Sequence, residues 1–466
     1  MFKSAPEGPS VLARALSRVW GGELPPGPRD PSGLWMALRL SAGTLEMLRE
    51  LSDSYGDLVH FKLLGSDYYL LNHPKDIEDA LAHQASAMAR DEYTEALVRA
   101  LGHGLLTSEG ELWRRQRKLM AQAFTPRRIR EYGETMVAVT DRGLNPNQGE
   151  VINLHALMSR VTMEVVAAVL FGAAITDEQI ARVGAAMQTL NRYYANSPEV
   201  VLMLPRWVPT PLNRQVNAAV EQLDAVVYSI IAARRRSNER RGDLLDTLLA
   251  AQDEGGAGMS DQQLRDEVTT LFLAGHETTA LALAHTIYLL AKHPEVERRL
   301  LAELDEVLAG RLPTVEDSKA LRYTKQVIDE AMRLYPPAWA TGREVAREVE
   351  IAGYRVPKGA QLLMSQWLVH RDPRFFPDPE AFDPDRWLPE RAKALPRYAY
   401  FPFGGGPRVC IGNHFALLEA TLVLAVVMQR FHFELLPGQT LAFAPSVTLR
   451  QKGPGLRVRV HARAGG

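Results

Sequence analysis

Cysteine is almost absent from this sequence of 466 residues, which contains only Cys410. An internal disulfide is therefore excluded, and so is a zinc site built from several cysteines. What remains is one free thiol, which in most proteins is simply a small buried apolar residue. So little cysteine suits a reducing compartment, and we expect the protein in the cytoplasm.

The chain also lacks an excess of either charge and a long apolar run near its start. It has 54 Lys and Arg against 55 Asp and Glu, which argues against a nucleic-acid partner or a polybasic membrane surface. A membrane anchor needs about 20 consecutive apolar residues. Residues 1–23 contain no such run, because Arg14 and Arg18 interrupt the one candidate stretch, Val11 to Trp20. We therefore expect no membrane anchor.

No linker, repeat or low-complexity tract divides the chain, and its 46% apolar and 23% charged residues are ordinary globular values. We expect a tail at residues 1–31 that ends in the proline-rich stretch Leu24 to Arg29, and one domain over residues 32–466, as a monomer. Apolar periodicity predicts mainly helix between residues 74 and 335, after a helix at 43–54. The expected β region is small, with strands at 59–64, 68–71, 349–351 and 361–364 and a final hairpin within 447–460.

The longest predicted helix begins at Ser260, where Gln263 completes a capping box, and runs to about Lys292. About 30 residues at 1.5 Å per residue span roughly 45 Å. Residues 274–279 in its middle read Ala-Gly-His-Glu-Thr-Thr, a weak point because Gly and Thr both disfavour a helix interior. An ordinary helix explains this too. A zinc-protease motif does not, because it needs a second His where the chain has Ala280.

The lone cysteine lies in a glycine-rich loop, residues 403–412, which reads Phe-Gly-Gly-Gly-Pro-Arg-Val-Cys-Ile-Gly. Such a loop lets backbone approach a flat ligand closely. The apolar segment 413–429 then predicts a helix, so Cys410 precedes a helix N-terminus. The helix dipole, the free N–H groups and the cation of Arg408 are expected to favour thiolate over thiol.

Phe403, Gly406, Arg408, Cys410 and Gly412 have the spacing of the haem-ligand loop of the cytochrome P450 family, and the chain resembles that family of haem-thiolate monooxygenases. The resemblance implies haem b, iron protoporphyrin IX, with Cys410 as the ligand of its iron. It also implies the cytochrome P450 fold, mainly α with a small β region and a long central helix over the haem.

The resemblance assigns roles to several further side chains. Glu277 and Thr278 would be catalytic, Thr278 by hydrogen-bonding dioxygen and Glu277 by relaying protons to it. Glu330, Arg333 and Arg386 would form a buried structural lock, although the first two alone could be a surface ion pair. The expected cofactor-binding residues, which include guanidinium partners for the haem propionates, are Trp113, Arg117, Arg343, Phe403, Arg408 and Cys410.

The resemblance also implies a hydrophobic substrate, because the residues expected above the iron are apolar or small. As single residues they could equally belong to the core. They are Leu97, Leu101, Leu105, Ala274, Ala338, Trp339, Ala340 and Val447.

Electrons would have to come from a separate protein, because only 56 residues follow Cys410. Seven basic residues and no acidic one lie between Trp113 and Arg130. A solvated helix face is the common explanation of such a run, but here we expect a docking surface for an acidic ferredoxin or flavodoxin with its NAD(P)H reductase.

The expected reaction is hydroxylation or epoxidation of a fatty acid, terpenoid, steroid or polyketide with O2. Two alternatives remain: a peroxide-dependent or rearranging haem-thiolate enzyme, and a haem-based sensor or carrier without turnover. The first is disfavoured because such enzymes typically replace the acid and the threonine found at Glu277 and Thr278.

Overall fold

The computed structural model describes residues 24–144, 149–172, 176–195, 207–237, 242–250, 258–439, 441–453 and 455–463. Most of the predicted tail, including the stretch Val11 to Trp20, lies outside these residues. The proline-rich stretch does not stand apart from the domain: the His60 amide donates to the Pro26 carbonyl at 2.9 Å. The Gly27 backbone passes so close that a Cβ there would lie 1.7 Å from the His60 oxygen.

The described helices are α2 (Leu34–Ala42), α3 (Thr44–Tyr55), α4 (Pro74–Glu78), α5 (Glu92–Ala96), α6 (Val98–Leu101), α7 (Gly110–Ala121), α8 (Pro126–Gly143), α9 (Leu154–Phe171), α10 (Asp177–Tyr194), α12 (Pro211–Ser237), α13 (Leu244–Ala250), α14 (Asp261–Lys292), α15 (Pro294–Leu308), α16 (Arg322–Leu334), α17 (Gln366–Val369), α18 (Pro389–Ala394) and α19 (Asn413–Arg430). Shorter 3-10 or π turns are η1 (Asp79–His83), η2 (Ala85–Ala87), η3 (Gln122–Phe124), η4 (Glu316–Lys319), η5 (Pro384–Trp387) and η6 (Gly406–Arg408). The strands are β1 (Leu58–Leu63), β2 (Ser66–Leu71), β3 (Met88–Ala89), β4 (Val151–Asn153), β5 (Thr341–Val345), β6 (Val349–Ile351), β7 (Tyr354–Val356), β8 (Gln361–Met364), β9 (Phe431–Leu435), β10 (Phe443–Pro445), β11 (Leu449–Gln451) and β12 (Arg457–Ala462).

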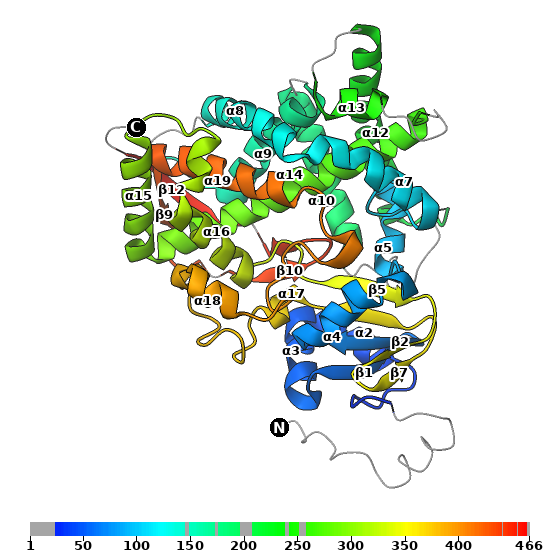
Figure 1. The fold of residues 1–466 in the computed structure, drawn as a ribbon. Helices are drawn as coiled ribbons and strands as arrows, with labels where there is room; N and C mark the ends of the chain where they lie inside the picture. The colour runs from blue at the N-terminus through cyan, green and yellow to red at the C-terminus, as the bar shows by residue number, and fades with distance from the viewer. Residues whose placement is uncertain are drawn as a thin grey trace.

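Helix α14 runs through the middle of the helical part of the molecule (Figure 1). It contacts α9, α12, α16 and α19, and most of its 32 residues are buried. The Ser260 hydroxyl accepts from the Gln263 amide at 3.2 Å at its start, and Pro294 follows its end. The predicted central helix is therefore confirmed. Its sequence is apolar on nearly all sides because other helices surround it, so it needs no polar face.

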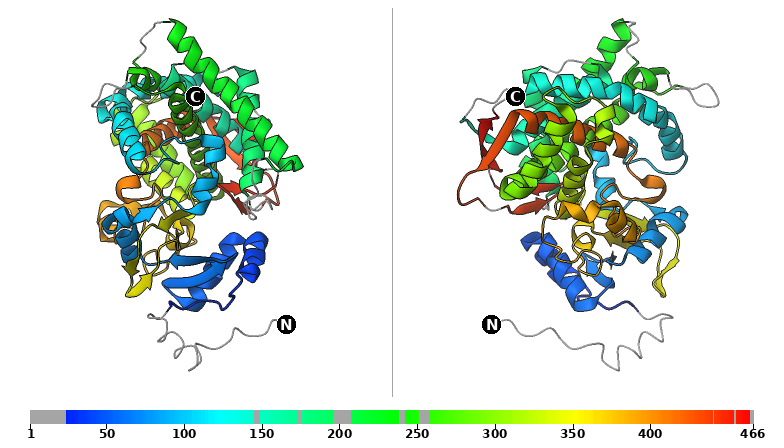
Figure 2. Two further views of the ribbon diagram at one scale, coloured as in Figure 1. Left: turned by 90° about the vertical axis from the view of Figure 1, so that its right-hand side faces the viewer. Right: turned by 60° about the vertical axis from the view of Figure 1, so that its left-hand side comes forward.

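A five-stranded sheet forms a separate part beside the helices, seen at the bottom of both views in Figure 2. Its strand order is β1-β2-β8-β5-β3. The antiparallel hairpin β1–β2 and strand β8 appear where they were predicted, and β2 pairs with β8 in parallel, Tyr68 opposite Gln361. Strands from the two ends of the chain are thus joined in one sheet.

One local prediction is wrong. Strands β10 and β11 form a hairpin that starts at Phe443, closed by the turn from Ser446 to Thr448, so the final hairpin does not lie within 447–460. Strand β12 instead pairs with β4 and β9, because Gly453 and Gly455, both at positive φ, redirect the chain after β11. The helix predicted over 74–83 is confirmed: α4 continues without a break into the π-helix η1, which ends at His83.

Two described helices, α9 and α12, are long and apolar enough to cross a bilayer. In the most apolar 18-residue stretch of each helix, 61% of the α9 residues and 33% of the α12 residues are buried inside the protein. A core helix passes the same test, and α9 packs on α14 and α8. The predicted class, mainly α with a small β region, is confirmed by the elements above.

Candidate active site around Cys410

The Cys410 loop is held by its own backbone and by its neighbours. The Cys410 amide donates to the Phe403 carbonyl at 3.0 Å, and the Tyr398 hydroxyl accepts from the Gly406 amide at 3.0 Å. A side chain at Gly406 would meet the Leu81 carbonyl at 1.7 Å, and this glycine has φ +64°. The loop therefore needs glycine there both for its conformation and for its close packing.

The environment of the Cys410 sulfur differs from the prediction. Burial raises the pKa of the Cys410 thiol, although the Gly412 amide and Arg117 each lower it. Without another cation the thiol form is favoured, because desolvation outweighs the amide and the guanidinium. Coordination to a metal ion supplies such a cation, since a ligating thiol is deprotonated. Cys410 is suited to this, because the residue is exposed although protein groups surround its thiol.

Helix α14 has an exposed position in its middle. Ala274 is exposed although Leu273, His276 and Glu277 around it are buried. The Thr278 hydroxyl, one turn further along, is partly exposed and donates to the Ala274 carbonyl at 2.7 Å. This exposed stripe is where the resemblance expects the substrate and dioxygen.

Two arginines near the loop have no carboxylate partner within 4 Å among the described residues. The Arg117 guanidinium donates to the Val409 carbonyl at 2.8 Å, and Arg343 donates to its neighbour, the Gly342 carbonyl, at 2.7 Å. Burial lowers the pKa of both. Guanidinium groups stay protonated at neutral pH, so these partly buried cations need an anion. Two propionates fit this donor set.

Arg408 and Trp113 lie together beside that set. The Arg408 guanidinium lies over the Trp113 ring at 4.3 Å and donates to the Ser108 carbonyl at 2.9 Å. It also pairs with Glu109 at 2.6 Å. Burial lowers the pKa of Arg408 to about 10, although Glu109 raises it. The structure thus brings Trp113, Arg117 and Arg408 to the loop, while sequence reasoning missed Glu109, which already neutralises part of the charge.

Glu277 lies in a buried ionic network that the sequence did not predict. Its carboxylate accepts from Arg450 Nε at 2.6 Å and from Arg450 Nη2 at 3.2 Å, and His155 Nε2 lies 4.0 Å away. Burial raises the pKa of Glu277, but Arg450 and His155 together outweigh it, so the pKa is lowered. Arg450 lies on β11, 173 residues further along the chain, and no local pattern links the two residues.

Glu330, Arg333 and Arg386 are brought together in one buried cluster. Glu330 accepts two bonds from Arg333, at 2.8 and 2.9 Å, and one from Arg386 at 3.2 Å. The Trp387 indole adds a fourth at 3.0 Å, which the sequence analysis did not assign. The remaining Arg333 donors reach backbone carbonyls between residues 370 and 381, so the cluster ties α16 to the segment before η5.

The predicted pocket residues divide into two groups. Leu97, Leu101 and Leu105 belong to the largest hydrophobic core cluster, with Val447 packed against it. Trp339 packs into two smaller clusters and donates its indole N–H to the Ser446 carbonyl at 2.8 Å, which fixes the ring beside the β10–β11 turn. Ala338 and Ala340 on either side of it are partly exposed.

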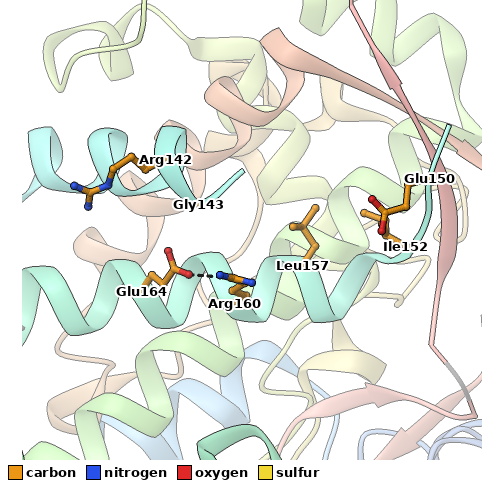
Figure 3. A pocket seen from close by; sticks show the side chains of 7 residues that line it. All are labelled: Arg142, Gly143, Glu150, Ile152, Leu157, Arg160 and Glu164. Atoms are coloured by element: carbon orange, nitrogen blue, oxygen red, sulfur yellow. Dashed lines mark hydrogen bonds and ion pairs between the residues drawn. The ribbon is translucent and has the colours of Figure 1, made fainter. Parts of the chain in front are cut away.

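A surface pocket seen in Figure 3 is a different place. It lies where α8 ends beside α9 and β4, and the Arg160–Glu164 ion pair at 3.0 Å crosses it. None of the predicted site residues lines it.

Comparison with known proteins gives consistent results. A family model described as "Cytochrome P450" matches residues 25–455. "Cyclooctat-9-en-7-ol 5-monooxygenase" of Streptomyces melanosporofaciens is 37% identical over 443 residues, 95% of this chain and 96% of that protein. "Pentalenene oxygenase" of Streptomyces avermitilis is 34% identical over 427 residues, 91% of this chain and 94% of that protein. Among solved structures, "Retinoic acid bound cyanobacterial CYP120A1" has a TM-score of 0.82 and 28% identity, covering 95% of this chain and 100% of that one.

Proposed function

The chain belongs to the cytochrome P450 family of haem-thiolate monooxygenases, and from this premise we propose that it is a haem b enzyme that hydroxylates or epoxidises a terpenoid. The observation that carries the proposal is the exposed Cys410 beside partly buried guanidinium groups that have no carboxylate partner within the described part of the chain. The names of two relatives, which refer to cyclooctat-9-en-7-ol and to pentalenene, support the substrate class. The predicted pocket residues, apolar or small, suit such a molecule.

The cofactor would be held by residues from both ends of the chain. Cys410 would be the ligand of its iron, Trp113 and Arg117 would bind one propionate, and Arg343 and Arg408 would be further propionate partners. When bound, haem b supplies oxygen activation at an iron whose thiolate ligand favours cleavage of the O–O bond. Phe403 at the start of the loop completes the set, and Glu330, Arg333 and Arg386 hold the surrounding backbone in place.

Proton delivery would fall to Thr278 and Glu277. The Thr278 hydroxyl is partly exposed on the pocket side of α14 and is already oriented by the Ala274 carbonyl. The Glu277 carboxylate is kept ionised by Arg450, which lowers its pKa and makes it a weaker base, so it takes up a proton only when its contact with Arg450 is broken. Passing that proton on requires Glu277 to turn away from Arg450 toward the adjacent threonine.

The proposed reaction combines one substrate C–H bond, one O2, two electrons and two protons to give one alcohol and one water. The electrons would come from a ferredoxin or flavodoxin with its NAD(P)H reductase, and the reaction would take place in the cytoplasm. The basic run of α7 and α8 supports an acidic redox partner. The Arg117 bond to Val409 joins that run to the Cys410 loop.

The test has two steps. The reduced protein, treated with carbon monoxide, should show the strongly red-shifted Soret band of thiolate ligation. A panel of cyclic terpenes and terpene alcohols, with a surrogate ferredoxin, its reductase and 18O2, should then give products that carry one labelled oxygen. Products formed with hydrogen peroxide but not with NADPH and partners would overturn the proposal in favour of a peroxide-dependent enzyme.

A further inference from the structure

Two polar side chains interrupt the apolar face of α14 above the exposed Ala274. Glu267, Thr270, Ala274 and Thr278 follow each other at spacings of three and four residues, so they share one face of the helix. Glu267 and Thr270 are buried, 0% and 4% exposed. Glu267 Oε1 and Thr270 Oγ1 nevertheless have no hydrogen-bond partner within the described part of the chain. Most buried polar atoms in proteins have a hydrogen-bond partner, so a donor or acceptor from outside the chain is expected at these two oxygens.

Both side chains contact the loop that carries the predicted pocket leucines. The Leu105 amide donates to Glu267 Oε2 at 2.9 Å. The backbone of Gly104 lies so close to Thr270 that a Cβ there would be 2.2 Å from Oγ1. Leu101 and Leu105 flank this contact, so the two unpartnered oxygens lie where the leucine loop meets the exposed stripe of α14.

The protonation state of Glu267 defines what it can bind. Burial raises its pKa to about 8, although the Leu105 amide lowers it. At neutral pH the side chain is therefore mainly a carboxylic acid, with one acceptor oxygen and one O–H donor. Oε2 serves as the acceptor for Leu105, which leaves Oε1 as a donor without an acceptor. The Thr270 hydroxyl can both donate and accept.

We propose that Glu267 and Thr270 hydrogen-bond a hydroxyl group that the substrate already carries, so that the substrate is a terpenoid alcohol and not a plain terpene hydrocarbon. Glu267 donates a hydrogen bond to the substrate oxygen, and Thr270 Oγ1 accepts a hydrogen bond from the substrate hydroxyl. The inference rests on the proposed function and deepens it. It implies that an earlier hydroxylation or hydration supplies the substrate.

The test compares alcohols with hydrocarbons of the same carbon skeleton. The probes are cedrol against cedrene and α-terpineol against limonene, and the dissociation constants come from the Soret shift of the haem-loaded protein. An alcohol is less hydrophobic than its hydrocarbon, so it binds more tightly only if its oxygen is hydrogen-bonded. We expect the alcohol of at least one pair to bind about tenfold more tightly, the effect of one to two buried hydrogen bonds.

Substitutions distinguish the hydrogen bonds of these two side chains from general effects of a substitution on packing. Thr270→Val should weaken alcohol binding about fivefold and change hydrocarbon binding less than about twofold. Thr269→Val is the matched control, because Thr269 is also buried and unpartnered but lies about 100° away around the helix. Glu267→Gln, which keeps an acceptor and a donor, should retain the alcohol preference, while Glu267→Leu should lose it. The carbon monoxide spectrum reports whether each variant is folded with haem.

Equal binding of alcohol and hydrocarbon by the wild-type protein would overturn the inference and leave the proposed function standing, because water would then satisfy these oxygens. An equal loss in Thr269→Val and Thr270→Val would overturn it too. If no terpene or terpene alcohol in the panel shifted the Soret band, the proposed function itself would fall and the inference with it.

Discussion

At the scale of single residues, the two threonines in the middle of α14 make the same backbone bond in different surroundings. Thr278 Oγ1 donates to the Ala274 carbonyl at 2.7 Å and is partly exposed, whereas Thr279 Oγ1 donates to Gly275 at 3.0 Å and is buried. We expect Thr278→Ala to lower the product formed per NADPH about tenfold, because the hydroxyl that delivers the proton is lost. Thr279→Val is the control and should keep most of the coupling. Unchanged coupling in Thr278→Ala would rule out the proton-delivery role.

Glu419 on α19 is another buried acid, and neither of its carboxylate oxygens has a hydrogen-bond partner among the described residues. Burial raises its pKa to about 8, and the Thr279 hydroxyl, which is bonded to Gly275, offsets only a small part. Between about pH 4.5 and 8 the unfolded chain is ionised at this position while the folded protein keeps its proton. Folding therefore loses stability as the pH rises through this window.

Glu419→Gln removes that dependence. We expect the variant to be more stable than the wild type by about 2 kcal/mol at pH 8, since each pKa unit corresponds to about 1.4 kcal/mol and burying the amide offsets part of it. At pH 5 the sign should reverse, and the variant should be about 1 to 2 kcal/mol less stable than the wild type, because the cost of burying the amide remains while the pKa effect is small. Melting temperatures measured by calorimetry at both pH values provide the check, and an equal shift at both would contradict the assignment of a protonated Glu419.

Arg450 and Glu277 form the opposite case, an acid whose pKa is lowered by a partner. The wild type gains stability from this pair above pH 4.5, the ordinary pKa of glutamate, and loses it as the pH falls. Arg450→Gln leaves the carboxylate buried without its cation, and we expect a loss of about 2 to 3 kcal/mol at pH 7. The added change Glu277→Gln should restore most of it. A double-mutant cycle in urea measures this, and additive losses would show that the pair is not coupled.

Arg450 is also an example of a site residue that could not be predicted from the sequence. The Cys410 loop has its ligand, its glycines and its arginine within ten residues, so its chemistry is visible locally. The partner of Glu277 lies 173 residues away, and Glu109, beside Arg408, has no distinguishing neighbours. Such contacts depend on tertiary packing, which a local pattern does not contain.

At the scale of elements, the strongest patterns gave the most accurate bounds. Helix α14 begins at its predicted cap and ends at Lys292 as predicted, and α19 extends only one residue beyond the predicted helix. The error at the end of the chain arose because β10 lacks strict alternation and has only three residues. Strands that short are defined by their partners and not by their own sequence.

The contact of α16 with the segment before η5 depends on Arg333. Its guanidinium makes five hydrogen bonds, two to Glu330 and three to the carbonyls of His370, Pro379 and Ala381. Lysine has three donors on one atom and cannot reproduce this fork. We expect Arg333→Lys to be purified with less than about a tenth of the wild-type haem, in line with a cost of about 3 to 5 kcal/mol for a broken buried ion pair. The ratio of Soret to 280 nm absorbance measures it.

Arg374 offers the control for that experiment. It lies in the same segment and pairs with Asp57 and Asp372, but its side chain is half exposed. Arg374→Lys should keep wild-type haem content. Full haem content in Arg333→Lys would contradict the structural role of the Glu330 cluster.

At the scale of the whole molecule, the basic run of α7 and α8 is less positive than its sequence suggests. Arg114 pairs with Glu111, and Arg127 and Arg128 both pair with Glu131. Acidic residues at the two ends of the run thus neutralise part of it. Arg130 is exposed and has no ion-pair partner among the described residues. A docking surface would then depend on fewer cations than the seven counted in the sequence.

Arg130→Glu should accordingly slow reduction by an acidic ferredoxin. We expect a loss of about three- to tenfold at low ionic strength that shrinks as salt is added, because steering by surface charge is screened. Stopped-flow formation of the carbon monoxide complex gives the rate. Arg298→Glu on α15 is the charge-matched control, since Arg298 is also exposed and belongs to an element outside the run. Equal effects of both variants would place the docking surface elsewhere.

The parallel pairing of β2 with β8 also determines when the sheet can form during synthesis of the chain. Residues 68–71 leave the ribosome long before residues 361–364, an interval of roughly 15 to 60 s at bacterial synthesis rates of 5 to 20 residues per second. During this interval one edge of the β1–β2 hairpin has no neighbouring strand, so its backbone groups can pair with those of other nascent chains. A shortage of chaperones should therefore reduce the yield of this enzyme before any defect of its catalytic centre becomes visible.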